Sequence, residues 1–196
     1  MTKIILASGS PRRKVLFGEI CPSFEVVPSQ FEEEGVPKTR GDIYAMALAY
    51  LKAQAVLEDY PQALVLGADT LIYFQGEVIG KPQDREEARA ILSRLSGQSH
   101  QVITGYAILT KDKKYLDYSR SIVTFKDLTD KAIEAYLDTG DYRDKAGAYG
   151  IQGQAKDLVA GYQGDLNNII GLPLEDLKGA LRNQGFIERD PGLWRV

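Results

Sequence analysis

The segment Ser8-Gly9-Ser10-Pro11-Arg12-Arg13 joins a short apolar run to the expected start of a helix. Free backbone N–H groups and the positive end of a helix dipole make such a junction an anion site, to which the Ser8 and Ser10 hydroxyls add donors. Two arginines in the first turn oppose the dipole by up to about 1 kcal/mol unless an anion offsets the repulsion. Guanidinium groups suit phosphate oxygens. A phosphate site and a solvated arginine pair both fit this segment.

Acidic side chains elsewhere could act on such a phosphate. Asp69 follows the apolar run 63–66, and ligand crevices in open α/β sheets form at the carboxyl ends of strands. With Thr70 beside it, Asp69 could accept a proton from water or hold a divalent cation, although an acidic turn residue fits the same pattern. Glu33, in the acidic run 32–34, could complete a Mg²⁺ site with Asp69 or belong to a solvated loop.

Two lysines are candidate phosphate contacts. The helix expected around Lys52 is apolar nearly all round, so one possible core face includes Lys52 and another leaves its ammonium in water. Lys81 lies between Gly80 and Pro82, whose rigidity could aim it at a phosphate, although a plain turn lysine fits equally well. The first core face consists of Ala45, Leu48, Ala49, Ala53 and Val56, and the second of Leu48, Leu51 and Ala55.

Several other chemistries lack the residues they need. His100 is the only histidine and no Gly-x-Ser-x-Gly elbow accompanies it, which favours a structural or hydrogen-bonding role over a Ser-His-Asp triad. No Gly-x-x-x-x-Gly-Lys-Ser/Thr element occurs, so an ordinary P-loop is excluded. Cys21 is the only cysteine, which excludes an internal disulfide and favours a reducing compartment.

Charge and length limit the partners and the organisation of the chain. The 196 residues include 24 basic and 27 acidic ones, a formal net charge of −3, which argues against nucleic acid polymers and anionic membranes as partners. The N-terminus becomes polar too early for a signal peptide or a membrane span, so we expect a soluble cytoplasmic protein. With 44% apolar residues and no linker or repeat, we expect a single domain over residues 1–196.

The elements that must position these residues alternate between short apolar runs and helical periodicity, which predicts an α/β domain. We expect strands over 4–7, 24–27 and 63–66, and hairpins that pair 71–74 with 77–79 and 102–109 with 115–125. We expect helices from Pro11 with Val15, Leu16 and Ile20 inward, over 42–57, over 88–95 before Gly97, over 130–137 and over 174–183.

Taken together and in order, these motifs resemble the Maf family of nucleoside triphosphate pyrophosphatases over nearly the whole chain. The matching segments are Ser8 to Arg13, Leu48-Ala49 with Lys52-Ala53, Gly67-Ala68-Asp69-Thr70, Gly80-Lys81-Pro82, Leu95-Ser96-Gly97 with His100, Thr104-Gly105, Ala146 to Gly153 and Gly171-Leu172-Pro173-Leu174.

The resemblance implies a fold like that of the inosine triphosphate pyrophosphatases. Such a fold is a twisted mixed β-sheet flanked by helices, with a cleft between two lobes and often a homodimer. The resemblance also implies Asp69 as the proton acceptor and Glu33 as an acidic residue near a divalent cation, Mg²⁺ or Mn²⁺. The implied specificity positions are Arg12, Thr70 and Gln152, and the implied phosphate contacts are Ser8, Arg13, Lys52 and Lys81.

Within the family, Asp69-Thr70 combined with Gln152 resembles the branch that acts on dTTP and UTP. A threonine hydroxyl and a glutamine amide can together satisfy the O4 acceptor and the N3 donor of a pyrimidine. We therefore expect a house-cleaning hydrolase that converts dTTP, UTP or modified pyrimidine nucleotides to monophosphate and pyrophosphate. The alternatives are a 7-methyl-GTP-type pyrophosphatase, a phosphohydrolase that releases inorganic phosphate, and a nucleotide-binding regulator of cell division and septum formation with little turnover. Leu166 stands where the family usually carries an aromatic residue, which concerns the local cleft wall.

Overall fold

The fold is built on one mixed sheet, seen in a computed structural model that describes residues 2–186. The strand order is β2-β1-β3-β5-β6-β7, with β4 paired to β3. Strand β1 is parallel to β2 and β3, and the other pairs are antiparallel. The strands are β1 (Ile4–Leu6), β2 (Glu25–Val26), β3 (Leu64–Phe74), β4 (Glu77–Ile79), β5 (Ser99–Leu109), β6 (Lys114–Phe125) and β7 (Val159–Gln163).

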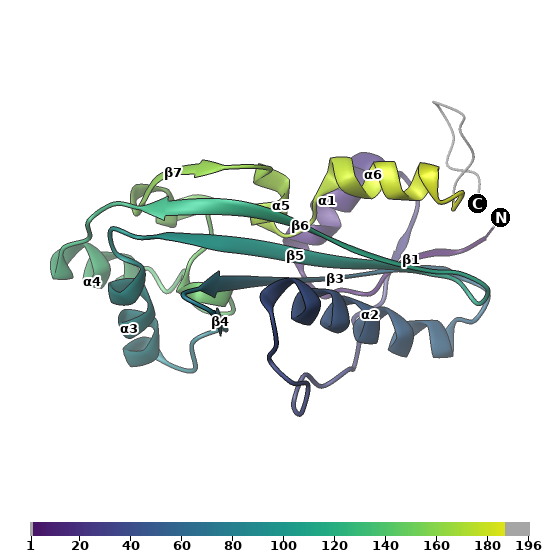
Figure 1. The fold of residues 1–196 in the computed structure, drawn as a ribbon, viewed down its shortest axis with the longest axis horizontal. Helices are drawn as coiled ribbons and strands as arrows, with labels where there is room; N and C mark the ends of the chain where they lie inside the picture. The colour runs from purple at the N-terminus through teal and green to yellow at the C-terminus, as the bar shows by residue number, and fades with distance from the viewer. Residues whose placement is uncertain (1, 187–196) are drawn as a thin grey trace.

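Helices flank this sheet on both faces, which confirms the predicted fold class. Figure 1 shows α2 on one side of the long strands and α1 with α6 on the other. The core follows the same division, since Ala49 and Ala53 pack against one face of β3 and Phe17 and Leu177 against the other. The helices are α1 (Pro11–Ile20), α2 (Gly41–Asp59), α3 (Arg85–Leu95), α4 (Asp130–Asp138), α5 (Leu166–Ile170) and α6 (Leu174–Asn183).

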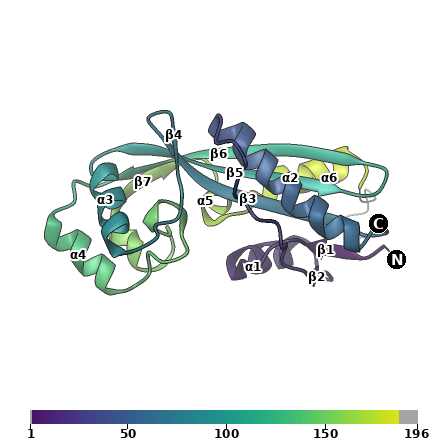
Figure 2. The same ribbon diagram turned by 90° about the horizontal axis from the view of Figure 1, so that it is seen from below.

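The long strands connect two lobes of different composition. At one end they carry α1, α2 and α6, and at the other end α3, α4 and β7 (Figure 2). The second lobe has its own apolar core, in which Leu92 of α3 and Leu137 of α4 pack with residues of two short 3₁₀ helices, η1 (Ala146–Ala148) and η2 (Gly153–Asp157). None of the helices within residues 2–186 is long and apolar enough to cross a membrane. Residues 1 and 187–196 of the expected single domain lie outside the described part.

Helix α2 lies unusually close to β3 and β5 because both strands have a glycine beneath it. A Cβ atom at Gly67 would lie 2.3 Å from the carbonyl oxygen of Ala49, and one at Gly105 would lie 2.3 Å from the carbonyl carbon of Ala45. Any larger residue at either position would force the helix away from the sheet. The two glycines therefore fix the height of α2 above the strand that contains Asp69.

The prediction that Asp69 follows a strand is wrong, because β3 continues through it. Strand β5 pairs with β3 from Val65 to Tyr73, and this pairing keeps the 11-residue strand extended. The strand that ends nearby is β1, whose last residue, Leu6, lies opposite Leu66. Asp69 therefore lies just beyond the carboxyl end of β1, where β3 has lost its parallel neighbour and a crevice can form.

Helix α1 begins as the sequence predicts but turns a different face inward. Pro11 is its first residue, and the Ser10 Oγ atom accepts a hydrogen bond from the Arg13 backbone N–H at 3.5 Å. Leu16 and Ile20 are buried as expected, together with Phe17. Val15 was expected inside and is 69% exposed, because the face that packs on β1 and α6 is formed by positions 16, 17 and 20.

The two predicted hairpins and the predicted helices α3, α4 and α6 are confirmed. In the β3–β4 turn Gln75 and Gly76 have φ angles of 52° and 86°, the conformation favoured in two-residue hairpin loops. Gly97 follows α3 with a φ angle of 67°, in the left-handed region that glycine adopts without strain. Strand β7 and helix α5 were not predicted.

Candidate active site

A cleft of about 630 Å³ opens between the two lobes beyond the end of β1. This volume is within the range of small-molecule sites, roughly 300–1,000 Å³. One wall is the segment Ala7 to Arg13 with β3, and the other is the segment Asp144 to Gln152. All nine site residues expected from the sequence line this cleft: Ser8, Arg12, Arg13, Glu33, Lys52, Asp69, Thr70, Lys81 and Gln152.

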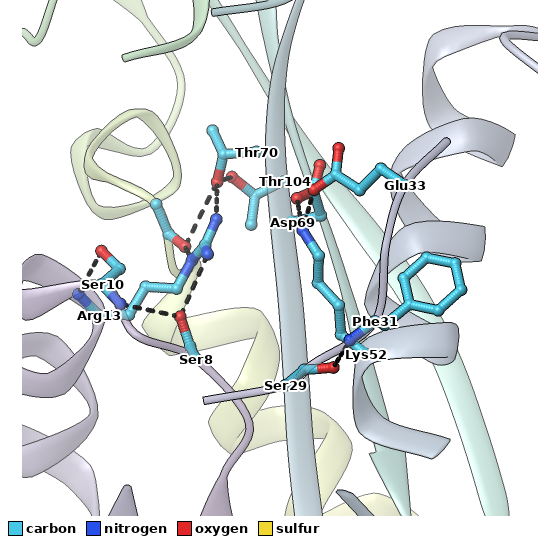
Figure 3. A network of polar contacts seen from close by, with 11 residues as sticks. Ser8, Ser10, Arg13, Ser29, Phe31, Glu33, Lys52, Asp69, Thr70 and Thr104 are labelled. Carbon is cyan, nitrogen blue, oxygen red and sulfur yellow. Dashed lines mark hydrogen bonds and ion pairs between the residues drawn. The ribbon is translucent and has the colours of Figure 1, made fainter. Parts of the chain in front are cut away.

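The nine residues do not form a single cluster. Strand β3 separates a group around Asp69 from a group around Thr70. Successive side chains of a strand point to opposite faces, so Asp69 faces α2 and Thr70 faces α1. Figure 3 shows Lys52 and Glu33 with Asp69 on one side of the strand, and Ser8 and Arg13 with Thr70 on the other. Both groups line the cleft because β1, which would cover this edge of β3, has ended.

Lys52 joins the two carboxylates of the first group. Its Nζ atom donates hydrogen bonds to Asp69 Oδ1 and Glu33 Oε1, each at 2.6 Å (Figure 3). Ala45, Leu48, Ala49, Ala53 and Val56 are all buried, so the core face of α2 is the one that surrounds Lys52. The Lys52 side chain is 17% exposed and reaches the cleft at the edge of this face.

The surroundings of Asp69 make its carboxylate a stronger proton acceptor than that of an ordinary aspartate. Burial raises the pKa of Asp69, and the nearby Glu33 carboxylate adds to the effect, although the positive charges of Lys52 and Arg13 oppose it. Burial lowers the pKa of Lys52, but the two carboxylates outweigh burial and the net direction is upward. Lys52 therefore stays protonated at neutral pH, beside a carboxylate with more affinity for a proton than an ordinary aspartate.

Arg13 joins three parts of the second group. Its guanidinium donates from Nε to the Gly171 carbonyl oxygen at 2.8 Å, from Nη1 to Ser8 Oγ at 3.3 Å and from Nη2 to Thr70 Oγ1 at 2.9 Å (Figure 3). These contacts tie α1 to β3 and to the end of α5. By contrast, neither Arg12 nor Lys81 has an ion pair within residues 2–186, and both side chains are exposed at the cleft.

The segment that carries Gln152 is held in an uncommon backbone conformation. Asp144, Gly147 and Ala148 have φ angles of 59°, 69° and 63°. At Gly147 a Cβ atom would lie 2.5 Å from Ile72 Cδ1, so a larger residue would have to displace the Ile72 side chain as well as adopt a strained positive φ angle. This close packing places Gln152 at the mouth of the cleft.

A buried histidine supports the same segment. His100 Nε2 and Tyr149 Oη are 2.6 Å apart, and His100 is only 2% exposed. Both rings pack edge-to-face with Phe125. His100 does not line the cleft, and the prediction of a hydrogen-bonding rather than catalytic histidine fits this position.

His100 is expected to make stability depend on pH. Burial lowers the pKa of His100 to about 4, whereas the unfolded chain binds this proton near pH 6.5. The unfolded state therefore gains a proton first as the pH falls, and the histidine's contribution to the free energy of unfolding should drop by about 2–3 kcal/mol between pH 7 and 4.5. Urea unfolding of the wild type and of His100→Gln at both pH values measures this drop. Equal pH dependence in the two proteins would contradict the assignment.

Several side chains in and behind the cleft are not among the residues predicted from the sequence. Lys145 lines it, and its Nζ atom donates to Asp141 Oδ1 at 2.9 Å. Tyr149 lines it too, while Thr104 and Asn168 lie directly behind Thr70. Tyr149 and Thr104 lie in motifs that support the family resemblance, but their neighbours depend on strand register and loop path, which no local pattern reveals. Leu166, which stands where the family usually carries an aromatic residue, does not line the cleft.

Comparisons with known proteins agree with the motifs. The family model described as "Maf-like protein" matches residues 3–184. A dTTP/UTP pyrophosphatase of Symbiobacterium thermophilum is 44% identical over 186 residues, covering 95% of this chain and 96% of that protein. Another, of Bacillus cytotoxicus, is 45% identical over 183 residues, covering 93% of this chain and 95% of that protein. The solved structure of the Staphylococcus aureus Ham1 protein matches with a TM-score of 0.48 and 16% identity over 64% of this chain and 73% of that chain. Because the family match spans nearly the whole chain, this protein belongs to the Maf family.

Proposed function

We propose that this protein hydrolyses dTTP and UTP to the nucleoside monophosphate and pyrophosphate. The observation that carries the proposal is the buried Asp69 carboxylate, paired with Lys52 in a cleft lined by further cations. A protein that only binds a nucleotide needs no base beside the phosphate site. Relatives that are 44–45% identical over at least 93% of the chain and are named dTTP/UTP pyrophosphatases support the choice of substrate.

In the proposed mechanism Asp69 acts as the general base. It takes a proton from a water molecule, whose oxygen forms a bond to the α-phosphorus while the bond from the α-phosphorus to the bridging oxygen breaks. Pyrophosphate leaves with the electron pair of that bond. A pKa raised by burial strengthens Asp69 as a proton acceptor. Arg13, Lys52 and Lys81 contact phosphates in this proposal, and Lys52 and Lys81 stabilise the charge that develops on the leaving group.

The proposed cofactor is Mg²⁺ or Mn²⁺, and the carboxylates fit it. Asp69 Oδ1 and Glu33 Oε1 lie near each other, because both accept a hydrogen bond from the Lys52 ammonium at 2.6 Å. No group of three histidine, cysteine or acidic side chains suited to a metal occurs among the described residues. Mg²⁺ commonly takes one or two carboxylates and completes its shell with water and substrate phosphates. Asp69 and Glu33 would hold the ion, which would screen the negative charge of the triphosphate.

The proposed base contacts are Arg12, Thr70 and Gln152, and Ser8 joins the phosphate contacts. All four line the cleft. We further propose a single catalytic domain over residues 1–196, a cytoplasmic location and a homodimer as the assembly. The buried free thiol of Cys21 fits a reducing compartment.

A product assay tests the function directly. The protein is incubated with Mg²⁺ and dTTP, UTP, CTP or 7-methyl-GTP, and the products are separated by chromatography. We expect monophosphate and pyrophosphate in equal amounts, with dTTP and UTP as the preferred substrates. Release of inorganic phosphate alone would indicate a phosphohydrolase, and binding without turnover would indicate a regulator. A preference for 7-methyl-GTP would overturn the proposed branch.

A further inference from the structure

We propose that Thr104 and Asn168 fix the direction of the Thr70 hydroxyl group, so that the cleft accepts a hydrogen from N3 of uracil or thymine and disfavours cytosine. Thr104 and Asn168 act through Thr70 and are positioning residues. The inference rests on the proposed function, because it assumes that a pyrimidine nucleotide occupies the cleft.

The three residues form a chain of short contacts behind the cleft. Thr70 and Thr104 are directly opposite each other on β3 and β5, with their Oγ1 atoms 2.9 Å apart (Figure 3). Thr104 Oγ1 is in turn 2.9 Å from the Asn168 backbone carbonyl oxygen. Thr104 and Asn168 are both fully buried, whereas Thr70 lines the cleft. The contacts behind Thr70 are therefore direct and shielded from solvent.

Counting hydrogens gives the chain a single direction. A carbonyl oxygen can only accept, so Thr104 must donate its one hydroxyl hydrogen to Asn168. The contact between the two threonines then needs the hydrogen of Thr70, which donates to Thr104 Oγ1 at 2.9 Å in preference to the Gly171 carbonyl oxygen, which is 3.5 Å away. Arg13 Nη2 can only donate, and it fills one lone pair of Thr70 Oγ1 at 2.9 Å. Thr70 has no hydrogen left for a ligand and offers only its remaining lone pair.

Asn168 is held rigidly enough to keep this direction. Its Oδ1 atom accepts from the Thr104 backbone N–H at 3.1 Å. Its Nδ2 atom donates to the Val102 carbonyl oxygen at 3.1 Å and to Ser121 Oγ at 2.8 Å. The amide thus connects α5 to β5 and β6. A buried network with every member satisfied specifies one geometry and is costly to rearrange.

The direction matters because Gln152 cannot choose between pyrimidines alone. Its amide can turn over and present either the carbonyl oxygen or the NH₂ group to a base. Uracil and thymine have a hydrogen on N3 and an acceptor at O4, whereas cytosine has an acceptor at N3 and an amino group at C4. An acceptor-only Thr70 suits the first pattern and leaves two lone pairs facing each other with the second. The preference would then originate in the buried chain behind Thr70.

The test removes one hydroxyl from this chain and compares two substrates. In Thr104→Val the shape is kept, but the Thr70 hydrogen loses its acceptor at 2.9 Å and keeps only the long contact of 3.5 Å to the Gly171 carbonyl oxygen, so it can turn to N3 of cytosine. We expect the ratio of kcat/KM for UTP to that for CTP to fall by about 10- to 100-fold, the effect of one mispaired buried hydrogen bond. Thr104→Ser retains the hydroxyl and should restore the ratio. Thr124→Val removes a hydroxyl that contacts Ser99 elsewhere on the same sheet and should leave the ratio unchanged.

The outcomes separate this inference from the proposed function. If the wild type hydrolyses neither UTP nor dTTP, the proposed function itself fails. If the wild type prefers UTP and Thr104→Val lowers kcat/KM equally for UTP and CTP, Thr104 is only structural and the inference is overturned. If Thr104→Val does not fold, the wild type is assayed with N3-methyl-UTP, which lacks the hydrogen. We expect kcat/KM about 10- to 100-fold below that for UTP, and equal values would overturn the inference.

Discussion

Replacement of Asp69 by asparagine is expected to lower kcat for dTTP by about 10²–10⁴-fold, the usual contribution of a general base. The amide has nearly the same shape as the carboxylate but cannot take a proton from water. Steady-state release of pyrophosphate measures the loss. Binding of dTTP should persist, because Arg12, Lys52 and Lys81 still line the cleft.

The pH dependence of the reaction provides a second readout of the same assignment. Because Asp69 must be ionised to accept a proton, kcat/KM of the wild type should fall as the pH is lowered through its pKa. Burial moves that pKa above the ordinary range of aspartate, so the fall should begin at a higher pH than for an exposed carboxylate. In Asp69→Asn this acid limb should disappear.

The fold should survive this substitution, since Lys52 keeps its ion pair with Glu33. Asp112→Asn serves as the matched control, because Asp112 lies in the exposed turn between β5 and β6 and its only ion pair within the described residues, to Lys111, is 3.9 Å long. It should retain wild-type turnover. An Asp69→Asn protein that unfolds at the wild-type urea concentration and keeps wild-type kcat would remove Asp69 from the role of base.

Local sequence patterns were sufficient for most of the elements. Helix α1 could be predicted because Ser10 and Pro11 mark its start independently of the rest of the chain. The hairpins could be predicted because Gln75-Gly76 and the charged segment Lys111 to Lys114 interrupt long β-like runs. Strand β7 could not, because its residues are largely exposed and it exists only through pairing with β6. Helix α5 has only five residues, too few for a periodic pattern.

Asp69 lines the cleft, but for a different reason from the one that the sequence predicts. The run 67–70 resembles a turn because glycine and alanine are poor strand residues. The small size of Gly67 has another cause, namely the close approach of α2 over this position. The crevice arises from the end of β1, which is far away in sequence. Only the strand order brings Leu6 beside Leu66 and opens the cleft next to Asp69.

The contacts of Arg13 and Lys52 depend even more on tertiary structure. The sequence indicates cations that could contact phosphates, but not that Arg13 would be tied to Gly171, 158 residues away. Likewise, Lys52 meets Glu33 across a loop without regular structure. The resemblance to known motifs identified the same residues without locating them. The roles of Arg13 and Lys52 as phosphate contacts stay predictions that mutation can test.

Loss of the Lys52 charge is expected to lower kcat by about 10²–10³-fold, the usual effect of removing one preorganised donor. Lys52→Met keeps most of the side chain's length and its packing on α2 but removes the ammonium group. The charge that develops on the leaving pyrophosphate then loses one of its stabilising partners. Turnover of dTTP at saturating substrate measures this loss.

The same variant should change the behaviour of Asp69. The ammonium lies 2.6 Å from Asp69 Oδ1 and opposes the effect of burial on the pKa of that carboxylate. Without it the pKa of Asp69 should rise further, so the acid limb of kcat/KM should move to higher pH. Lys178→Met, which removes a partly exposed lysine paired with Glu175 on α6, controls for the change in net charge. A Lys52→Met enzyme with lower turnover and an unmoved acid limb would show that Lys52 serves the phosphates without tuning the base. Wild-type turnover would exclude both roles.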